Sequence, residues 1–461
     1  MNKTALILAL SLIAAPAAAQ TKPVIRKSAA APKKAASVLP ETPRVPFSAP
    51  AVQKIVTKSG ITAWLIEEKN TPVIAVSVIF KGGSSADPAR LQGLSDLVAA
   101  TLDDGAGRYD AQEFGDLLEE NGIKMAFGAS ADYFSASMQT LRGTKEQAFA
   151  LFKSALTNPR FDRKDVRRAK DSFYAQIDAQ KGSPSAQAKE RFFKLSFKNH
   201  PYGALEPSKK GLKEISRANM TRYVRERFAR DNMHIGVSGN IDANELSGLL
   251  EKTFAALPAR AVLKPVPPTQ PAITGYTDVL SRPAAQSAVV FGHKGIPRDA
   301  PDFYAAYLVM HVFGDGGFQS RLFSEAREKQ GLTYGVSASM AMLKASPMII
   351  GGAQADNAKM AQLVQTIRDV WRKTAKNGIT AQELDDAKMY LTGAFPLLFS
   401  SSGALASFLA SMQYQNLGAD YLNERNALFE SVTLEQANAA AAKVLTPDNL
   451  FFVIIGKPAN L

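Results

Sequence analysis

The stretch SRLFSEAREKQGLTYG, residues 320–335, contains an arginine and a tyrosine that could donate hydrogen bonds to a bound group. A guanidinium has five N–H donors and a phenol has one O–H donor. The apolar spacing predicts a helix over the first twelve residues, which Gly331 ends and Leu332 follows with an apolar contact. A helix end explains Arg327 only as a favourable cation in the last turn, and it leaves Tyr334 unexplained. Arg327 and Tyr334 are therefore candidate functional residues.

The glycine-rich stretch FGDGGFQS, residues 313–320, comes directly before this helix. Gly316 and Gly317 lie in it, and they are candidates for the border of a substrate site. A plain loop at the entry to the helix is an equally good interpretation.

Metal and thiol chemistry find little support elsewhere in the chain. Cysteine is absent, so thiolate catalysis and cysteine-bound metals are excluded. An amphipathic helix predicted over 93–102 places Asp96, Ala99 and Ala100 on its inner face, and a single carboxylate is not a metal site. No two of the four histidines have helical spacing, so we expect a structural role for each of them. The four are His200, His234, His293 and His311.

An internal repeat divides the chain into two halves. RDNMHIGVSGNID begins at Arg230 and PDNLFFVIIGKPA begins at Pro447, and each has glycine eight residues after its aspartate. Upstream, Asp162 and Thr380 are predicted N-caps of matching helices, and Glu383 completes a capping box with Thr380. The separation from cap to Asp-Asn is 69 residues in the first half and 68 in the second.

The elements within each half predict an α+β fold used twice, with an antiparallel-rich sheet packed against helices. Residues 61–80 predict a hairpin whose turn lies at Lys69-Asn70. Residues 134–141 alternate like a half-buried strand. Residues 361–378 have helical spacing and end at Gly378.

The remaining divisions follow from composition. Residues 1–19 have a lysine, an apolar core and small residues at the end, as in a cleaved signal peptide, which predicts a periplasmic protein. Residues 20–49 predict a flexible basic tail. The halves cover 50–256 and 284–461, and a proline-rich linker, 257–283, joins them.

The net charge of +13 is not accompanied by any nucleic-acid motif, so nucleic acid is not expected as a partner. No later stretch is long and apolar enough to predict stable membrane insertion. Composition is that of a globular protein, with 46% hydrophobic and 21% charged residues.

The order of these features resembles the pitrilysin/insulinase family of zinc metallopeptidases, the inverted zincins. The resemblance rests on the strand with its Gly-Ser turn, the Gly-Leu helix, the HPYG turn at 200–203 and the DNM before a last strand, and it spans about residue 50 to residue 461. In that family the first helix carries His-x-x-Glu-His, which holds zinc and supplies the general base. The corresponding positions, the third ligand and its supporting acid included, are all altered here. They are Asp96, Ala99, Ala100, Gln176 and Ala169.

The resemblance implies that this chain binds no zinc and does not cleave peptides alone. The family favours Asn-Ala-x-Thr on its peptide-binding strand, and this chain has Met-Ala-Phe-Gly at 125–128, which places substrate pairing there in doubt. Residues 320–338 are similar to the family's second-half signature. Its arginine and tyrosine hold the substrate backbone, and the tyrosine helps to stabilise the tetrahedral oxyanion. Arg327 and Tyr334 match these two positions.

Some members of the family are split between two chains, and this sequence resembles their zinc-lacking, substrate-binding subunit in a periplasmic peptidase. The implied assembly is a clam-shell heterodimer with a zinc-bearing homologous subunit, acting on peptides. One alternative is a non-proteolytic scaffold or peptide-binding protein of the cell envelope. Another is a homodimer with a cryptic metal site around Asp96 and Gln176.

Overall fold

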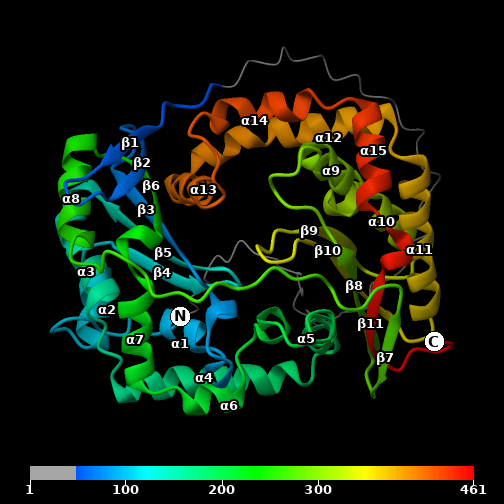
Figure 1. Ribbon diagram of the computed structural model, residues 1–461, viewed down its shortest axis with the longest axis horizontal. Helices are drawn as coiled ribbons and strands as arrows, with labels where there is room; N and C mark the ends of the chain where they lie inside the picture. The colour runs from blue at the N-terminus through cyan, green and yellow to red at the C-terminus, as the bar shows by residue number, and fades with distance from the viewer. Residues whose placement is uncertain (1–47) are drawn as a thin grey trace, which may run out of the picture.

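The computed structural model describes residues 48–461 and arranges them as two halves, each built around one sheet (Figure 1). The first sheet has six strands in the order β1-β2-β6-β3-β5-β4. Its strands are β1 Gln53–Val56, β2 Thr62–Glu67, β3 Val73–Lys81, β4 Lys124–Ala129, β5 Tyr133–Leu141 and β6 Met233–Gly239.

The second sheet has five strands in the order β7-β11-β8-β10-β9. They are β7 Thr277–Ser281, β8 Gln286–Lys294, β9 Val336–Ala341, β10 Met348–Asp356 and β11 Phe451–Gly456.

The strand order confirms the internal repeat. Without β1, the first sheet reads β2-β6-β3-β5-β4, and each strand has its counterpart at the same place in the second sheet. The pairs β2–β6 and β7–β11 are parallel, and the other pairs in both sheets are antiparallel. The hairpin predicted over 61–80 is wrong, because β6 lies between β2 and β3 and pairs with both.

Fifteen helices are found in the described part of the chain. In the first half they are α1 Leu94–Ala99, α2 Ala111–Glu120, α3 Lys145–Thr157, α4 Arg163–Gln180, α5 Pro184–Ser196, α6 Lys209–Glu214, α7 Arg217–Arg227 and α8 Ala243–Phe254. In the second half they are α9 Phe303–Met310, α10 Arg321–Phe323, α11 Met360–Asn377, α12 Ala381–Gly393, α13 Ser402–Tyr414, α14 Tyr421–Glu430 and α15 Leu434–Val444.

The two halves exchange one helix each. Helix α13 of the second half packs on β6 and β3 of the first sheet, and α5 of the first half packs on β8 and β11 of the second sheet. Leu405 and Leu409 of α13 share a buried cluster with Trp64 and Ile66 of β2. Phe192 of α5 does the same with strands of the second sheet. Each sheet therefore has one face covered by the other half of the chain.

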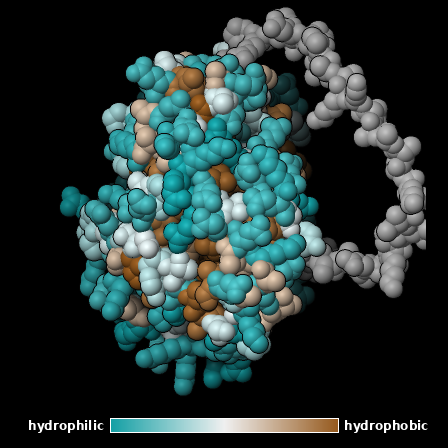
Figure 2. Space-filling model, turned by 90° about the vertical axis from the view of Figure 1, so that its right-hand side faces the viewer, coloured by the Kyte–Doolittle hydropathy of each residue, from teal (hydrophilic) through white to brown (hydrophobic). Residues whose placement is uncertain are grey.

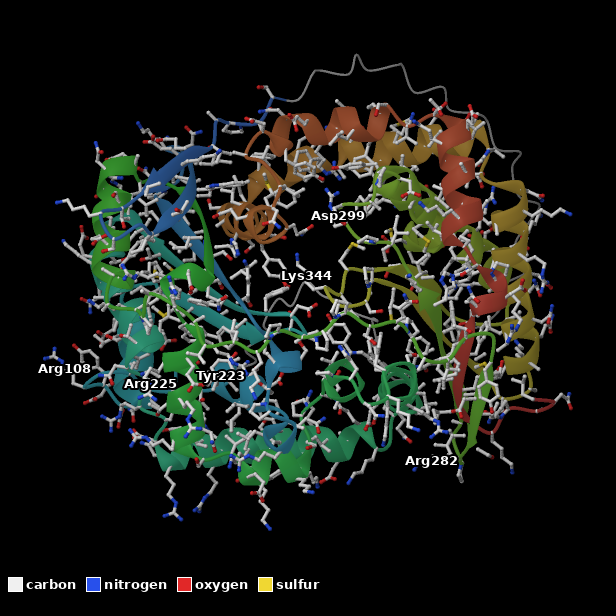
Figure 3. The ribbon with its side chains drawn as sticks, in the orientation of Figure 1. Arg108, Tyr223, Arg225, Arg282, Asp299 and Lys344 are labelled. Atoms are coloured by element: carbon white, nitrogen blue, oxygen red, sulfur yellow. The ribbon has the colours of Figure 1, made fainter. Side chains whose placement is uncertain are left out.

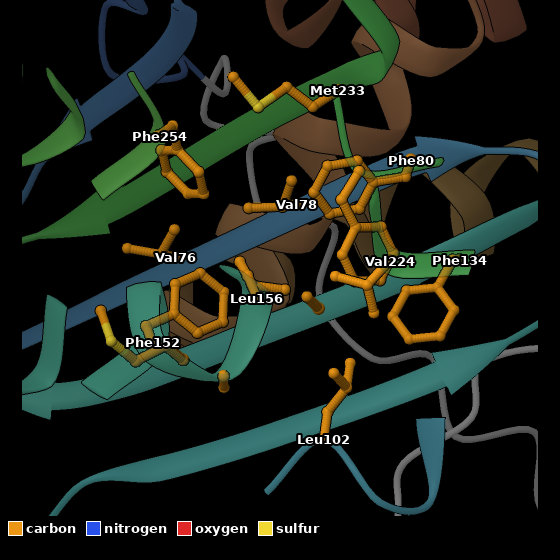
Figure 4. Close-up of a cluster of buried hydrophobic side chains, with 14 of the residues drawn as sticks. Val76, Val78, Phe80, Leu102, Phe134, Phe152, Leu156, Val224, Met233 and Phe254 are labelled. Carbon is orange, nitrogen blue, oxygen red and sulfur yellow. The ribbon is translucent and has the colours of Figure 1, made fainter. Parts of the chain in front are cut away.

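The opposite face of the first sheet holds the largest core of that half. Val76, Val78 and Phe80 of β3 lie at its centre, with Phe134 of β5 and Phe254 of α8 around them (Figure 4). In the second half, the buried side of α11 packs onto the core around Trp371. The outer side of that half is largely hydrophilic, with small separate hydrophobic areas (Figure 2).

The junction differs in detail from the sequence prediction. Strand β7 lies inside residues 257–283, so the second sheet begins within the segment expected to be a linker. It is an edge strand, paired only with β11. Its sequence is short and lies in a proline-rich segment, so it gave no clear strand pattern. Ala49, expected to lie in the flexible tail, is buried and donates its N–H to Asn423. The predicted signal peptide and residues 20–47 of the tail lie outside the described residues.

Among residues 48–461, no single helix is long and apolar enough to cross a bilayer. One pair of helical segments, Ala381–Ser400 with Ser402–Tyr414, satisfies length and composition only when taken together, and it is bent by 115°.

Candidate functional site

Arg327 and Tyr334 lie against each other on the surface of the second half. A terminal N–H of the Arg327 guanidinium donates to the backbone carbonyl of Tyr334, and the guanidinium carbon is 5.7 Å from the centre of the Tyr334 ring. The Tyr334 side chain is 80% exposed. Within the described residues this is the one hydrogen bond of the Arg327 side chain, so its other N–H groups are free to bind a ligand carbonyl.

The segment that carries Tyr334 is anchored on both sides. Gly331 adopts a left-handed φ of 59° and ends the helical turn, as predicted. Leu332 is buried and donates its N–H to Ala326, while the Thr333 hydroxyl donates to the carbonyl of Gln354 on β10 at 2.6 Å. These anchors hold the backbone of an exposed tyrosine, which lowers the entropy lost when the tyrosine binds a substrate.

The helix predicted over 320–331 is present, but only its first turn is α-helical and the rest is a wider π-helix. Helix α10 ends at Phe323, and Ser324–Lys329 continues it as a π-helical turn. A second π-helical turn, His311–Asp315, directly follows α9. Such widened turns are rare and occur often at functional sites. Their position on both sides of the glycine-rich loop marks this region independently of the arginine and tyrosine.

The glycine-rich loop lies beside the pair, and its two glycines differ. A Cβ on Gly316 would come 2.6 Å from the carbonyl oxygen of His311, so this glycine lets the chain close tightly after the π-helical turn. Gly317 has a φ of 60° and open space around it. The next residue, Phe318, is 74% exposed and packs edge-on against Phe323, whose ring also faces Arg327.

Sequence reasoning missed the exposed Phe318 and two buried residues that support this region, Phe323 and Thr333. The rings of Phe318 and Phe323 have centres 4.9 Å apart, and the Arg327 guanidinium lies 5.4 Å from the Phe323 ring. The available signal was a phenylalanine directly after two glycines, since a large apolar side chain in a loop is unusual unless something covers it. An aromatic surface beside free guanidinium donors can bind both the side chains and the backbone of a peptide.

The positions that match the family's zinc site lie in the other half, on α1 and α4, and they do not fit zinc. Asp96 is half-buried, Ala99 is buried, and Ala100 and Gln176 are exposed. Ala169 is buried in the core next to α1. Among the described residues there is no group of three or more His, Asp or Glu side chains that could hold a metal ion. One carboxylate and one amide do not make a tetrahedral zinc site.

An ion pair fixes the entry to α1. The Asp87 carboxylate accepts both the backbone N–H and the hydroxyl of Ser95, at 2.8 and 2.7 Å, and pairs with Arg227 at 3.1 Å. Arg227 also donates to the carbonyl of Ala86. Burial raises the pKa of Asp87 despite the attraction of Arg227. This network holds the helix that would carry the metal ligands, although the ligands are missing.

Other predicted features also have definite places. Met125-Ala126-Phe127-Gly128 lies on β4, the edge strand of the first sheet. His293 is buried and accepts the backbone N–H of Thr446, and His200 accepts that of Tyr202. His311 stacks on the ring of Tyr390. Burial lowers the pKa of His234 to about 4, with help from two nearby lysines.

Two family models match the chain. Residues 63–205 match the model described as insulinase (peptidase family M16), and residues 214–391 match the model described as peptidase M16 inactive domain. A Bacillus subtilis protein described as an uncharacterized zinc protease, YmxG, is 23% identical over 86% of this chain and 96% of its own. A Helicobacter pylori protein described as a non-peptidase homolog is 25% identical over 72% of this chain and 78% of its own.

Solved structures agree in fold. A crystal structure described as a peptidase M16 inactive domain from Pseudomonas fluorescens has a TM-score of 0.83 and 29% identity, and covers 88% of this chain and 98% of its own. A protease from Helicobacter pylori has a TM-score of 0.79 with 19% identity, and covers 88% of this chain and all of its own. At that identity the second match concerns the fold alone.

Proposed function

Because this chain belongs to the insulinase family of peptidases, M16, and is a non-catalytic member of it, we propose that it is the substrate-binding subunit of a two-chain zinc peptidase of the periplasm. A homologous subunit with an intact zinc motif supplies the metal and the attacking water. This chain supplies Arg327 and Tyr334 at the scissile bond. The two chains close as a clam shell around peptides.

One observation carries the proposal: the losses fall in one half of the chain. The first half keeps the helix but none of its zinc ligands. The second half keeps Arg327 and Tyr334 in contact, exposed and anchored. A protein with only a structural role would not need an exposed tyrosine on such an anchored segment.

The expected roles follow from the chemistry of the two side chains. Free guanidinium N–H groups of Arg327 bind substrate carbonyls, and the Tyr334 hydroxyl donates to the oxyanion that develops during attack. The exposed ring of Phe318, which packs on the buried ring of Phe323, lies beside them and contacts the side chains of the peptide.

The test measures peptide cleavage after mixing this chain with a zinc-bearing homologue from the same cell. Tyr334→Phe removes one oxyanion donor and is expected to lower kcat by roughly 10²–10³ with little change in KM. Tyr276→Phe, at an exposed tyrosine on another part of the second half, is the matched control. Full activity of the Tyr334→Phe complex would favour a non-proteolytic scaffold. Chelator-sensitive cleavage by this chain alone would contradict the proposal.

A further inference from the structure

Positive charge is concentrated in one continuous part of the chain. Residues 160–230 contain 19 Lys and Arg against 8 Asp and Glu, a formal charge of +11. The rest of the described chain, residues 48–159 and 231–461, contains 29 against 33 and is therefore slightly acidic, at −4. The net charge of this protein is thus not a general property of its surface.

Helices α4, α6 and α7 of this stretch belong to the helical layer of the first half, whereas α5 packs on the second sheet. Helices α4 and α6 run along the lower edge of the view in Figure 1. Along this edge, side chains that end in nitrogen extend away from the molecule (Figure 3). The charge therefore lies on an outer side of the fold.

The basic face is defined here by six exposed cations, none of which forms an ion pair within the described residues. They come from the three helices that meet there: Arg163 and Arg167 on α4, Lys210 and Lys213 on α6, and Arg217 and Arg222 on α7.

Hydrogen bonds hold the three helices of the basic face together. Lys170 on α4 donates to the carbonyl of Ile215 at 2.7 Å, between α6 and α7. Arg217 at the start of α7 donates to the carbonyl of Arg160, just before α4, at 2.9 Å. Other cations of the layer are already neutralised, as Lys209 is by Asp178. The six cations of the basic face have no such ion pair within the described residues.

We propose that the basic face binds the anionic phospholipid headgroups of a bilayer surface. Lysines and arginines near an anionic membrane each contribute favourable electrostatic energy, and several together are needed for stable attachment. A layer of helices that presents cations outward suits a broad anionic surface. The proposal does not depend on a peptidase role, since the basic face lies in the first half and the Arg327–Tyr334 pair in the second.

The composition of the layer favours lipid over nucleic acid. Single strands bind through aromatic side chains on which bases stack. Among the described residues, none of the exposed large hydrophobic side chains lies within 160–230. The aromatic residues of α4, Phe173 and Tyr174, are half-buried against the core. Attachment through this face is therefore electrostatic, without apolar insertion, and it weakens as salt is added.

The test is cosedimentation of the full chain with vesicles of phosphatidylcholine alone or mixed with phosphatidylglycerol, at low and high salt. The variant Arg163→Gln/Arg167→Gln/Lys213→Gln/Arg222→Gln removes four cations that make no side-chain hydrogen bond within the described residues. The control, Lys58→Gln/Lys373→Gln/Lys376→Gln/Lys457→Gln, removes four exposed cations elsewhere and changes the net charge equally. All three proteins have the same N-terminal residues.

We expect salt-sensitive binding to the anionic vesicles only, with partitioning of the basic-face variant weaker by roughly tenfold or more and that of the control close to the unsubstituted chain. Equal losses in both variants would show that net charge alone matters and would overturn the proposal. Binding to neutral vesicles at the same strength would also overturn it. Tight binding to a nucleic-acid duplex without vesicle binding would overturn the proposal and identify nucleic acid as the partner of the basic face. Thermal unfolding of each variant checks that the fold is intact.

Discussion

Asp96 is the clearest single residue whose chemistry the fold has changed. One oxygen of its carboxylate is buried and has no hydrogen-bond partner. Burial, followed by repulsion from Asp87 and Glu206, raises its pKa from 3.8 to about 7. The half-buried carboxylate at the first position of the lost zinc motif is therefore held partly protonated near neutral pH, which makes it a poor metal ligand.

This raised pKa predicts a pH-dependent stability. The unfolded chain releases the Asp96 proton near pH 4 and the folded chain near pH 7, so the folded state holds one more proton between these values. The free energy of unfolding should fall as pH rises through this window, by about 4 kcal/mol, because one pKa unit corresponds to about 1.4 kcal/mol.

Asp96→Asn should remove most of this loss. Urea unfolding at pH 5 and pH 8 measures it: the variant should gain stability relative to the unsubstituted chain mainly at pH 8. Asp171→Asn, at an exposed position on α4, is the control and should leave the pH dependence unchanged. The explanation fails if Asp96→Asn shifts stability equally at both values.

At the scale of elements, Gly236 determines how closely α13 approaches the first sheet. A Cβ on Gly236 would lie 2.1 Å from the carbonyl oxygen of Ala406 and 2.6 Å from the N of Ala410, both on α13. The neighbouring contact is specific, since Gln413 donates to the carbonyl of Ile235 at 2.7 Å. The strand backbone at Gly236 can accept alanine, so the obstacle is α13: its backbone and the Cβ of Leu409, which would lie 2.8 Å away.

Gly236→Ala should therefore destabilise the protein by about 2 kcal/mol or more, because the helix must move away from the strand. Gly248→Ala on α8 is the matched control, since its Cβ would meet nothing within 4 Å, and it should stabilise the helix by up to about 1 kcal/mol. Denaturant unfolding of both variants measures the difference, and hydrogen exchange should show faster opening of β6 and α13 only in Gly236→Ala. Equal stabilities would contradict the close approach.

Elements with local signals were predictable from the sequence. The capping box of Thr380 and Glu383 is present at the start of α12, and the strand over 134–141 alternates in burial as expected. Asp162 occupies the N-cap of α4, yet its carboxylate bonds Arg160 and not a helix N–H. The local sequence indicates which residue occupies the N-cap. It does not indicate whether the carboxylate of that residue accepts from a helix N–H or from the neighbouring Arg160.

Features set by distant segments were not predictable. The hairpin prediction over 61–80 failed because β6, more than 150 residues further along the chain, lies between β2 and β3 and pairs with both. The π-helical turns and the contact between Phe318 and Phe323 depend on packing that no local pattern reports. Arg327 and Tyr334 were identifiable because both side chains lie near one helix end, and their contact confirms only their proximity.

At the scale of the whole molecule, the exchange of α5 and α13 makes each half incomplete without the other. Leu405, Leu409 and Met412 of α13 are buried against the first half, and each such side chain contributes about 1.5–3 kcal/mol when removed from water. Asp132 of the first half links the halves further, since its carboxylate accepts the Tyr202 hydroxyl at 2.6 Å and the backbone N–H of Lys344 at 3.0 Å. The sequence repeat suggests two independent domains, but the packing predicts one cooperative unit.

Separating the chain between Lys264 and Pro265 tests this. The cut follows Leu263, which lies against Gly82 of the first half. Each fragment alone exposes the sheet face that the other half covers, so we expect neither to show a cooperative unfolding transition or to resist protease. Mixed together, they should form a one-to-one complex by light scattering and recover both properties. The full chain, cleaved at an introduced protease site at the same bond, controls for the cut and should remain assembled. Two independent unfolding transitions in the intact chain, or a stable isolated half, would contradict this. Either result would mean that each sheet folds without the helix contributed by the other half.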